Sequence, residues 1–224
     1  MKHHRIIGIG ILCLCMPGCV NQYSRWAQKT FNQGTPLDQY QQEVAPFLIT
    51  EHLYDQFNTI GIFDALWLAA PVRRAYAELA IEKTGKSERD YEILVQKELE
   101  KNNDLISFYV LIEKEYTIRG LKQIGDADDA LWSTYLEIDD TVVHPVSIDK
   151  VDLAPEYRTM FGSRVSEYKA RLKQAYRISF DAHGVPGQPF IHDDVEKMSL
   201  VLSTTEKRVC LTWAWPARLE RRRS

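Results

Sequence analysis

Leu105-Ile106-Ser107-Phe108-Tyr109-Val110-Leu111-Ile112 is the stretch that decides the predicted fold. Apolar side chains occupy both sets of alternating positions along it, whereas a strand with one face in water alternates apolar and polar residues. A strand that is apolar on both faces is typical of the middle of a covered sheet. We therefore predict a central strand over residues 105–112, with the rest of a sheet-rich body built around it.

Two helices are predicted immediately before this strand. Pro71 suits the first turn of a helix that runs to about Lys83 and ends at Gly85. Ser87 has the position of an N-cap, and Asp90, three residues on, completes a short capping box. The helix that follows places one apolar set on a single face and stops at residues 102–104; the set is Tyr91, Leu94, Val95 and Leu99.

Residues 47–70 fit two interpretations. The spacing of their apolar side chains fits a helix, but the content of Ile, Thr, Phe, Tyr and Trp fits two strands of a hairpin interrupted at Asn58-Thr59. We favour the hairpin.

After Gly125 the apolar period becomes two, which predicts strands. Residues 132–138 alternate, residues 139–141 turn, and residues 143–151 return as a second strand. Residues 155–172 are helix-like, with Gly162 inside them, and alternation resumes at Tyr176, Ile178 and Phe180 before a turn over 183–189. The last hairpin pairs Met198, Leu200 and Leu202 with Val209, Leu211, Trp213 and Trp215 across a polar turn at 204–207.

These elements predict an α+β fold, an antiparallel β-sandwich-like body with a helical pair packed at one end. We divide it into a strand and helix-pair subdomain over residues 47–125 and an antiparallel β-rich subdomain over residues 126–216. A basic tail over residues 217–224 follows, with Arg218, Arg221, Arg222 and Arg223.

The front of the chain has the pattern of an export leader. Lys2 and Arg5 supply a cationic start, and Ile6 to Cys15 form an uncharged apolar run. This run is far shorter than the roughly 20 residues that a membrane-spanning helix needs. We predict a signal peptide over residues 1–18, and a lipidated amino terminus with a polar tether over residues 19–46.

Met16-Pro17-Gly18-Cys19, which closes the leader, resembles the lipobox of bacterial lipoproteins, with Met in place of the usual Leu. The resemblance implies diacylglycerol on the Cys19 thiol, cleavage before Cys19, and acylation of the new amino terminus. The expected location is therefore the cell envelope, with the chain held on a membrane by this lipid. The same resemblance implies the outer membrane, because Val20 follows the cysteine instead of Asp, and we expect the body to face the periplasm.

Composition limits the function classes. The chain has 28 basic and 31 acidic residues, and the mature chain is more negative because Lys2 and Arg5 leave with the leader. This balance argues against a nucleic-acid partner, which needs a clustered positive face. Cys210 is the one cysteine outside the leader and its cut, so no intramolecular disulfide is expected.

Several segments of the body resemble predicted lipoproteins of Gram-negative bacteria. They are Leu53-Tyr54-Asp55-x-Phe57, the helical pair, Leu131-Trp132, Val146-Ser147-Ile148, and a closing strand that ends in Trp. That family has no assigned activity, so the resemblance implies a fold shape and no chemistry.

Two clusters of acidic and histidine residues are candidate metal sites. Gly125–Asp129 holds three carboxylates but lacks the 12-residue calcium-loop pattern, so a solvated loop is the favoured interpretation. His183 and His192-Asp193-Asp194 flank a turn, without the third or fourth ligand at defined spacing that zinc needs. His52 and His144 fit core or rim positions. We expect no metal and no cofactor.

No catalytic motif stands out. Cys210 is out of phase with its apolar neighbours, so it faces the opposite side of its strand, and we expect an inert buried thiol despite the nearby Arg208. The favoured function is a non-enzymatic module that binds or scaffolds an envelope protein or polymer. One alternative is a hydrolase of envelope polymer that uses two unmarked carboxylates. A second is a carrier of a small apolar ligand held between the sheets.

Overall fold

The computed structural model describes residues 36–55, 58–114, 132–162, 173–185 and 188–214. The chain divides into two compact units at Gln39/Tyr40, and the body described here is the unit that begins at Tyr40. Helix α2 (Pro36–Val44) straddles this division, and a short 3₁₀ helix, η1 (Ala45–Phe47), follows it. No helix in the described ranges is long and apolar enough to cross a bilayer.

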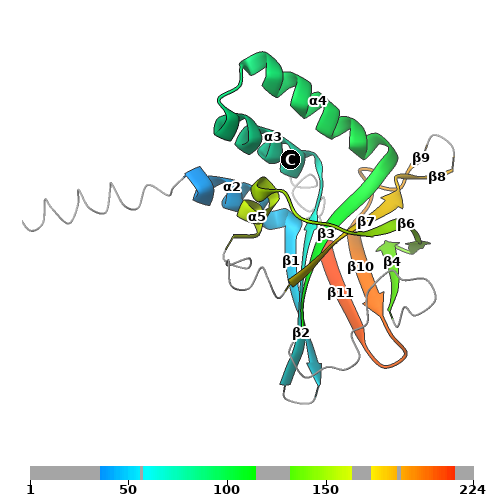
Figure 1. The fold of residues 1–224 in the computed structure, drawn as a ribbon. Coiled ribbons are helices and arrows are strands. Elements are labelled where there is room, and N and C mark those ends of the chain that lie inside the picture. Colours follow the sequence, from blue (N-terminus) through cyan, green and yellow to red (C-terminus); the bar gives the residue numbers. More distant parts are fainter. Residues whose placement is uncertain (1–35, 56–57, 115–131, 163–172, 186–187, 215–224) are drawn as a thin grey trace, which may run out of the picture. The chain divides into compact units, whose positions relative to one another are not determined.

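Sheet A is the larger of the two main sheets, and each of its strands is antiparallel to its neighbours (Figure 1). The predicted strand at residues 105–112 is confirmed and lies in its middle. In spatial order the strands are β1 (Leu48–Asp55), β2 (Asn58–Trp67), β3 (Leu105–Lys114), β7 (Lys173–Asp181) and β6 (Pro145–Lys150).

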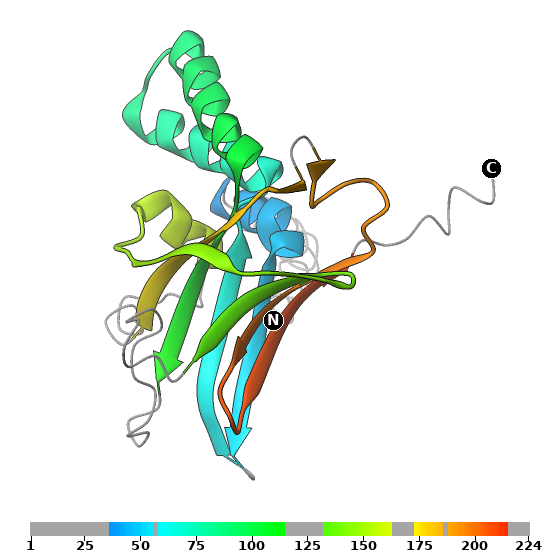
Figure 2. The same cartoon turned by 90° about the vertical axis from the view of Figure 1, so that its right-hand side faces the viewer.

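Sheet B packs against one face of sheet A (Figure 2). Its predicted hairpin is confirmed for the described residues: Met198 pairs with Trp213, Leu200 with Leu211, and Leu202 with Val209. In spatial order the strands are β11 (Arg208–Ala214), β10 (Lys197–Ser203), β4 (Ser133–Ile138) and β5 (Thr141–Val143). A small separate hairpin consists of β8 (His183–Val185) and β9 (Gln188–Pro189).

The main core fills the space between the two sheets. Its largest side chains are fully buried, and both sheets contribute them: Phe63, Phe108, Ile178 and Phe180 from sheet A, and Leu136, Met198, Leu200 and Leu202 from sheet B. Strands on both sides of the predicted subdomain boundary share sheet A and this core; the boundary itself, at 125/126, lies outside the described residues.

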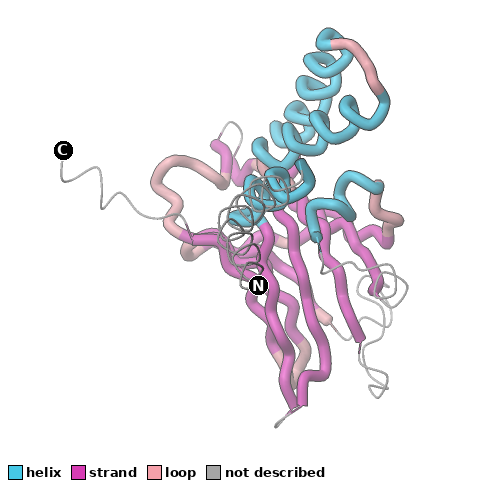
Figure 3. Tube along the Cα trace, turned by 90° about the vertical axis from the view of Figure 1, so that its left-hand side faces the viewer, coloured by secondary structure: helices cyan, strands magenta, loops and turns pink. Residues whose placement is uncertain are grey.

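The other face of sheet A is covered by helices, which explains why β3 is apolar on both faces. Figure 3 shows the helices gathered toward one end of the strands. The second core there joins Leu66 and Leu111 of the sheet to side chains of α3 (Ala70–Thr84) and α5 (Pro155–Phe161). With α4 (Glu88–Asp104), α3 forms the predicted helical pair, so the α+β sandwich with a helical pair is confirmed.

Local signals explain both helices of the pair. Gly85 caps α3 with φ +61°, the left-handed conformation in which glycine has no steric penalty. Ser87 and Asp90 form the predicted capping box of α4: the Ser87 hydroxyl accepts from the Asp90 N–H, and the Asp90 carboxylate accepts from the Ser87 N–H at 3.1 Å.

Three boundary predictions were wrong. Residues 143–151 form two elements, because the chain leaves sheet B after Val143 and joins sheet A at Pro145, which has no N–H to donate to a ladder. The helix begun at Pro155 ends at Phe161, because Gly162 takes φ +60° and ψ −139°. Asn58 and Thr59 lie within β2 and do not interrupt it.

Three tyrosines pack together between the helices and sheet A. The rings of Tyr76 and Tyr157 stack with centroids 4.5 Å apart, and Tyr109 meets Tyr157 nearly edge-on at 4.8 Å. Burial, and secondly the negative charge of Glu98, raises the pKa of Tyr157 well above its ordinary value of 10.0. Ionisation of this phenol therefore costs folding free energy.

We expect the wild-type protein to lose stability relative to Tyr157→Phe as the pH rises above 10. A raised folded-state pKa contributes stability that is complete below the unfolded-state pKa and is lost above it, at about 1.4 kcal/mol per pH unit for one group. Urea unfolding of both proteins between pH 8 and 11 measures this difference. Parallel curves for the two proteins across that range would contradict the buried phenol.

Candidate ligand-binding site

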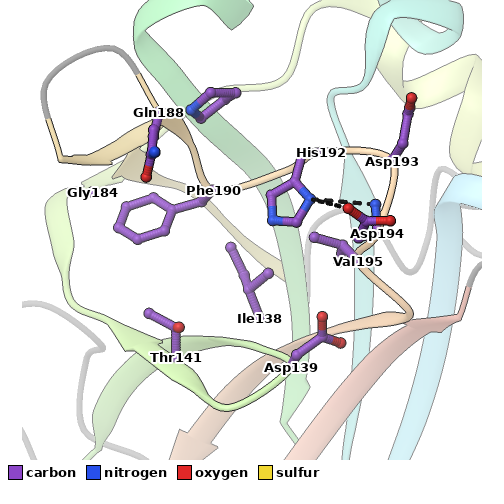
Figure 4. Close-up of a pocket in the computed structure, with 11 residues that line it drawn as sticks. Ile138, Asp139, Thr141, Gly184, Gln188, Phe190, His192, Asp193, Asp194 and Val195 are labelled. Atoms are coloured by element: carbon purple, nitrogen blue, oxygen red, sulfur yellow. Dashed lines mark hydrogen bonds and ion pairs between the residues drawn. The ribbon is translucent and has the colours of Figure 1, made fainter.

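A cavity of about 790 Å³ lies where the β4–β5 turn meets the segment that leads from β8 to β10 (Figure 4). The turn contributes Ile138, Asp139 and Thr141. The opposite wall comes from Gly184, Gln188, Pro189, Phe190 and residues 192–195. This volume is within the range of about 300–1,000 Å³ that is usual for small-molecule sites.

Asp139 joins the two walls. It takes a positive φ of 47°, which aspartate tolerates better than most residues in a tight turn. Its carboxylate accepts hydrogen bonds from the backbone N–H groups of Glu196 at 3.2 Å and Lys197 at 3.1 Å, while its own N–H donates to the Lys197 carbonyl at 3.1 Å. The Asp139 carboxylate therefore holds the loop before β10 against the β4–β5 turn.

Phe190 is held in place by its backbone and by its ring. Its N–H donates to the Ala182 carbonyl at 2.8 Å, which closes the β8–β9 hairpin. The ring lies so close to Gly184 that a Cβ there would be 2.7 Å from the Phe190 Cε1 atom. The ring is half-buried and packs at the margin of the main core. An aromatic surface therefore forms part of the wall.

His192 lies next to Phe190 in the cavity wall (Figure 4). Its Nδ1 atom accepts a hydrogen bond from the Asp194 N–H at 3.3 Å and is 3.9 Å from the Asp194 carboxylate. Because Nδ1 is an acceptor, the neutral imidazole carries its hydrogen on Nε2. His192 can therefore donate one hydrogen bond from Nε2 to a ligand.

The described residues of the cavity wall include no lysine or arginine, and the ionisable ones are Asp139, His192, Asp193 and Asp194. A wall with this charge disfavours anionic ligands. Hydrolysis by a carboxylate pair requires two acidic groups that face each other across the cleft. Asp139 is occupied by backbone N–H groups, and Asp193 points away from the cavity (Figure 4). Neither Asp139 nor Asp193 is therefore placed to act as one member of such a pair.

The four histidines that the sequence offers as candidates lie in different parts of the structure. His192, Asp193 and Asp194 line the cavity, while His183 begins β8 and is not part of that wall. His52 and His144 are both exposed; the His52 ring stacks against Tyr54 with centroids 6.0 Å apart. Within the described ranges, no group of three or more His, Cys, Asp or Glu side chains is placed to hold a metal ion.

Cys210 lies on the outer face of sheet B, opposite the core side of β11, as its phase predicts. It is half-buried, so the expectation of a buried thiol is only partly met. Its neighbour Arg208 donates to the Glu137 carboxylate at 2.7 Å, and Cys210 and Glu137 together raise the pKa of Arg208. This arginine thus interacts with both Glu137 and Cys210.

Trp213 is buried in the core, and its indole N–H donates to the Phe47 carbonyl at 3.0 Å. Cys19, the carboxylates of Gly125–Asp129, Trp215 and the basic tail over 217–224 lie outside the described residues.

Sequence reasoning missed Phe190 and the β4–β5 turn as parts of a site. The turn at residues 139–141 was identified, but nothing local pairs it with a loop more than forty residues later. The Gly184–Phe190 contact leaves no periodic signal either.

Comparison with known proteins adds a structural likeness. No protein-family model and no curated protein matches the chain. The chain is similar to the crystal structure of a novel protein of unknown function from Burkholderia pseudomallei, with a TM-score of 0.39 and 10% sequence identity. The match covers 86% of this chain and 88% of that one. A likeness of this size assigns neither a family nor an activity.

Proposed function

We propose that this chain is a lipid-anchored, non-enzymatic binding module of the cell envelope, held on the outer membrane through Cys19 and facing the periplasm. Its ligand site is the cavity between the β4–β5 turn and the loop that carries Phe190 and His192. The observation that carries the proposal is this cavity, which combines an aromatic ring with polar side chains and has the size of a small-molecule site.

The non-enzymatic part of the proposal is supported by the way the acidic side chains are used. Asp139 accepts two backbone N–H groups, and the Asp194 backbone and carboxylate lie against His192. A general acid or base must reach the atom whose proton it moves. Side chains already engaged in holding the loop are poorly placed for that task.

The carrier alternative receives no support from the space between the sheets. Phe63, Phe108 and Phe180 on one side, and Leu136 and Leu200 on the other, are fully buried against one another. Protein interiors packed in this way have no room for an apolar ligand unless side chains move. We therefore place the ligand at the edge of the sandwich and not inside it.

The anchor is tested by Cys19→Ser in cells grown with labelled palmitate. We expect the wild-type protein to incorporate label and to fractionate with membranes, and the variant to lose both properties, because the thiol is the proposed attachment atom. Cys210→Ser is the matched control and should remain labelled. Label that persists in Cys19→Ser would overturn the anchor.

Ligand binding is tested by a pull-down from solubilised envelope with native, lipidated protein. Phe190→Ala removes the aromatic surface of the cavity, whereas Ile93→Ala trims a side chain that is 59% exposed on α4 and serves as the matched control. A defined envelope component should be retained by wild type and by Ile93→Ala, and lost from Phe190→Ala. Equal retention by all three proteins, or by none, would contradict the proposed site.

A further inference from the structure

We propose that the ligand of this cavity is a neutral sugar, presented as a short segment of an uncharged glycan. This inference rests on the proposed function, since it names the ligand class of the same site. It is drawn from three properties of the wall: an aromatic ring, a mixture of hydrogen-bond donors and acceptors, and the absence of basic side chains among its described residues.

The ring and the polar groups match the two kinds of surface that a sugar presents. A pyranose has a face of C–H groups, which packs on an aromatic ring, and an edge of hydroxyls, each of which both donates and accepts. Phe190 supplies the ring. Gln188 supplies a donor and an acceptor on one amide, Thr141 supplies a hydroxyl, and His192 supplies the Nε2 donor left by its Nδ1 contact with Asp194.

The charge of the wall favours a neutral ligand over an anionic or a cationic one. An anionic ligand, including a sulfated or phosphorylated sugar, would meet the carboxylates of Asp139 and Asp194 and, among the described residues of the wall, no lysine or arginine. A cationic ligand would compete with two backbone N–H groups for the Asp139 carboxylate, and the Asp193 side chain points away from the cavity (Figure 4). A neutral ligand needs no charged partner, and these constraints do not affect it.

The contact between the Phe190 ring and Gly184 provides a second variant with which to test the site. A methyl group at position 184 would lie 2.7 Å from Cε1 and 2.9 Å from Cζ of the ring, closer than real Cβ contacts allow. Gly184→Ala must therefore displace the ring from its present place while leaving every polar group of the wall in the chain. The variant tests ring position separately from ring chemistry.

The experiment is calorimetric titration of the full, native protein in a detergent without a sugar head group. The probes are a tetramer of β-1,4-linked N-acetylglucosamine, maltotetraose, and a sulfated oligosaccharide of the same length. We expect saturable binding of at least one neutral probe, and binding of the sulfated probe that is weaker by about tenfold or more, because the wall repels anions.

Phe190→Ala should weaken binding of the neutral probe by about tenfold, and Phe190→Tyr should restore most of it, because the tyrosine ring offers the same face. Gly184→Ala should weaken binding although Phe190 is retained. Ile93→Ala should bind as the wild type does. Thermal unfolding of every variant distinguishes lost binding from lost folding.

Three results would overturn the inference: no binding of either neutral probe, tighter binding of the sulfated probe, or binding that Phe190→Ala leaves unchanged. These three results concern only the class of ligand, and the pull-down tests the proposed function independently. If the pull-down recovers a component through Phe190 while neutral sugars do not bind, the module stands and the sugar class is wrong. If the pull-down shows no dependence on Phe190, the site itself is wrong.

Discussion

Replacing Glu98 by alanine is expected to lower the free energy of unfolding by about 3–5 kcal/mol, because it leaves the charge of a buried arginine without its carboxylate partner. Arg73 on α3 donates from Nη1 to the Glu98 carboxylate at 3.1 Å, and from Nε to the Asn102 side-chain oxygen at 2.6 Å. The two charged side chains are only 4% and 7% exposed. Urea unfolding followed by circular dichroism measures the loss.

Lys101→Ala is the matched control for this prediction. Lys101 also pairs with Glu98, but its side chain is 48% exposed, so its removal should cost less than about 1 kcal/mol. The double variant Arg73→Met with Glu98→Leu should recover much of the stability, because it removes both charges and fills the space with apolar atoms. Equal losses for Glu98→Ala and Lys101→Ala would show that burial of the pair has no energetic consequence.

The loss should be concentrated in the helical pair. Glu98 is the one buried side chain of α4, whose apolar residues are half-buried or exposed. A helix with so little buried surface depends on few contacts and opens easily. Amide hydrogen exchange in Glu98→Ala should therefore speed up in α4 well before it does in the strands of the sandwich.

Phe108→Ala is expected to lower the free energy of unfolding by about 3–5 kcal/mol, through the cavity that it leaves in a close-packed core. Phe108 is fully buried on β3. Its ring meets Phe180 of sheet A edge-on at 5.9 Å and Trp213 of sheet B at 5.0 Å. The side chain thus links the two sheets at the centre of the sandwich, where the surroundings have little freedom to collapse.

Chemical denaturation with tryptophan fluorescence measures this change, since Trp213 is a direct neighbour of the removed ring. Val146→Ala provides the comparison: its side chain is 60% exposed on β6, so its truncation should change stability by less than about 0.5 kcal/mol. A loss below 1 kcal/mol for Phe108→Ala would mean that the two sheets do not share the close-packed core described above.

Much of the fold was predictable because its signals are local. Ser87 and Asp90 are three residues apart, Gly85 follows its helix directly, and the β10–β11 register follows from alternation around one short turn. The crossing from sheet B to sheet A between Val143 and Pro145 was missed. Apart from Pro145, nothing in the local sequence separates these two strands, and their partners become known only from the folded body.

The candidate site was less predictable than the fold. His192 and Asp194 attracted attention as neighbours in sequence, but their setting depends on Asp139, which holds their loop through the amides of Glu196 and Lys197. The wall also depends on Phe190, whose ring lies where a side chain larger than glycine at position 184 would collide with it. Such contacts between distant segments have no periodicity, so composition and spacing do not reveal them.

The position of β3 between β2 and β7 has a consequence for how the chain matures. A nascent polypeptide presents β1, β2, the helical pair and β3 well before residues 173–181 emerge to complete the ladder. Until then β3 has one open edge and is apolar on both faces, a combination that recruits strands from other molecules. We therefore expect that the open edge of β3 must be protected from pairing with other chains until β7 has been synthesised.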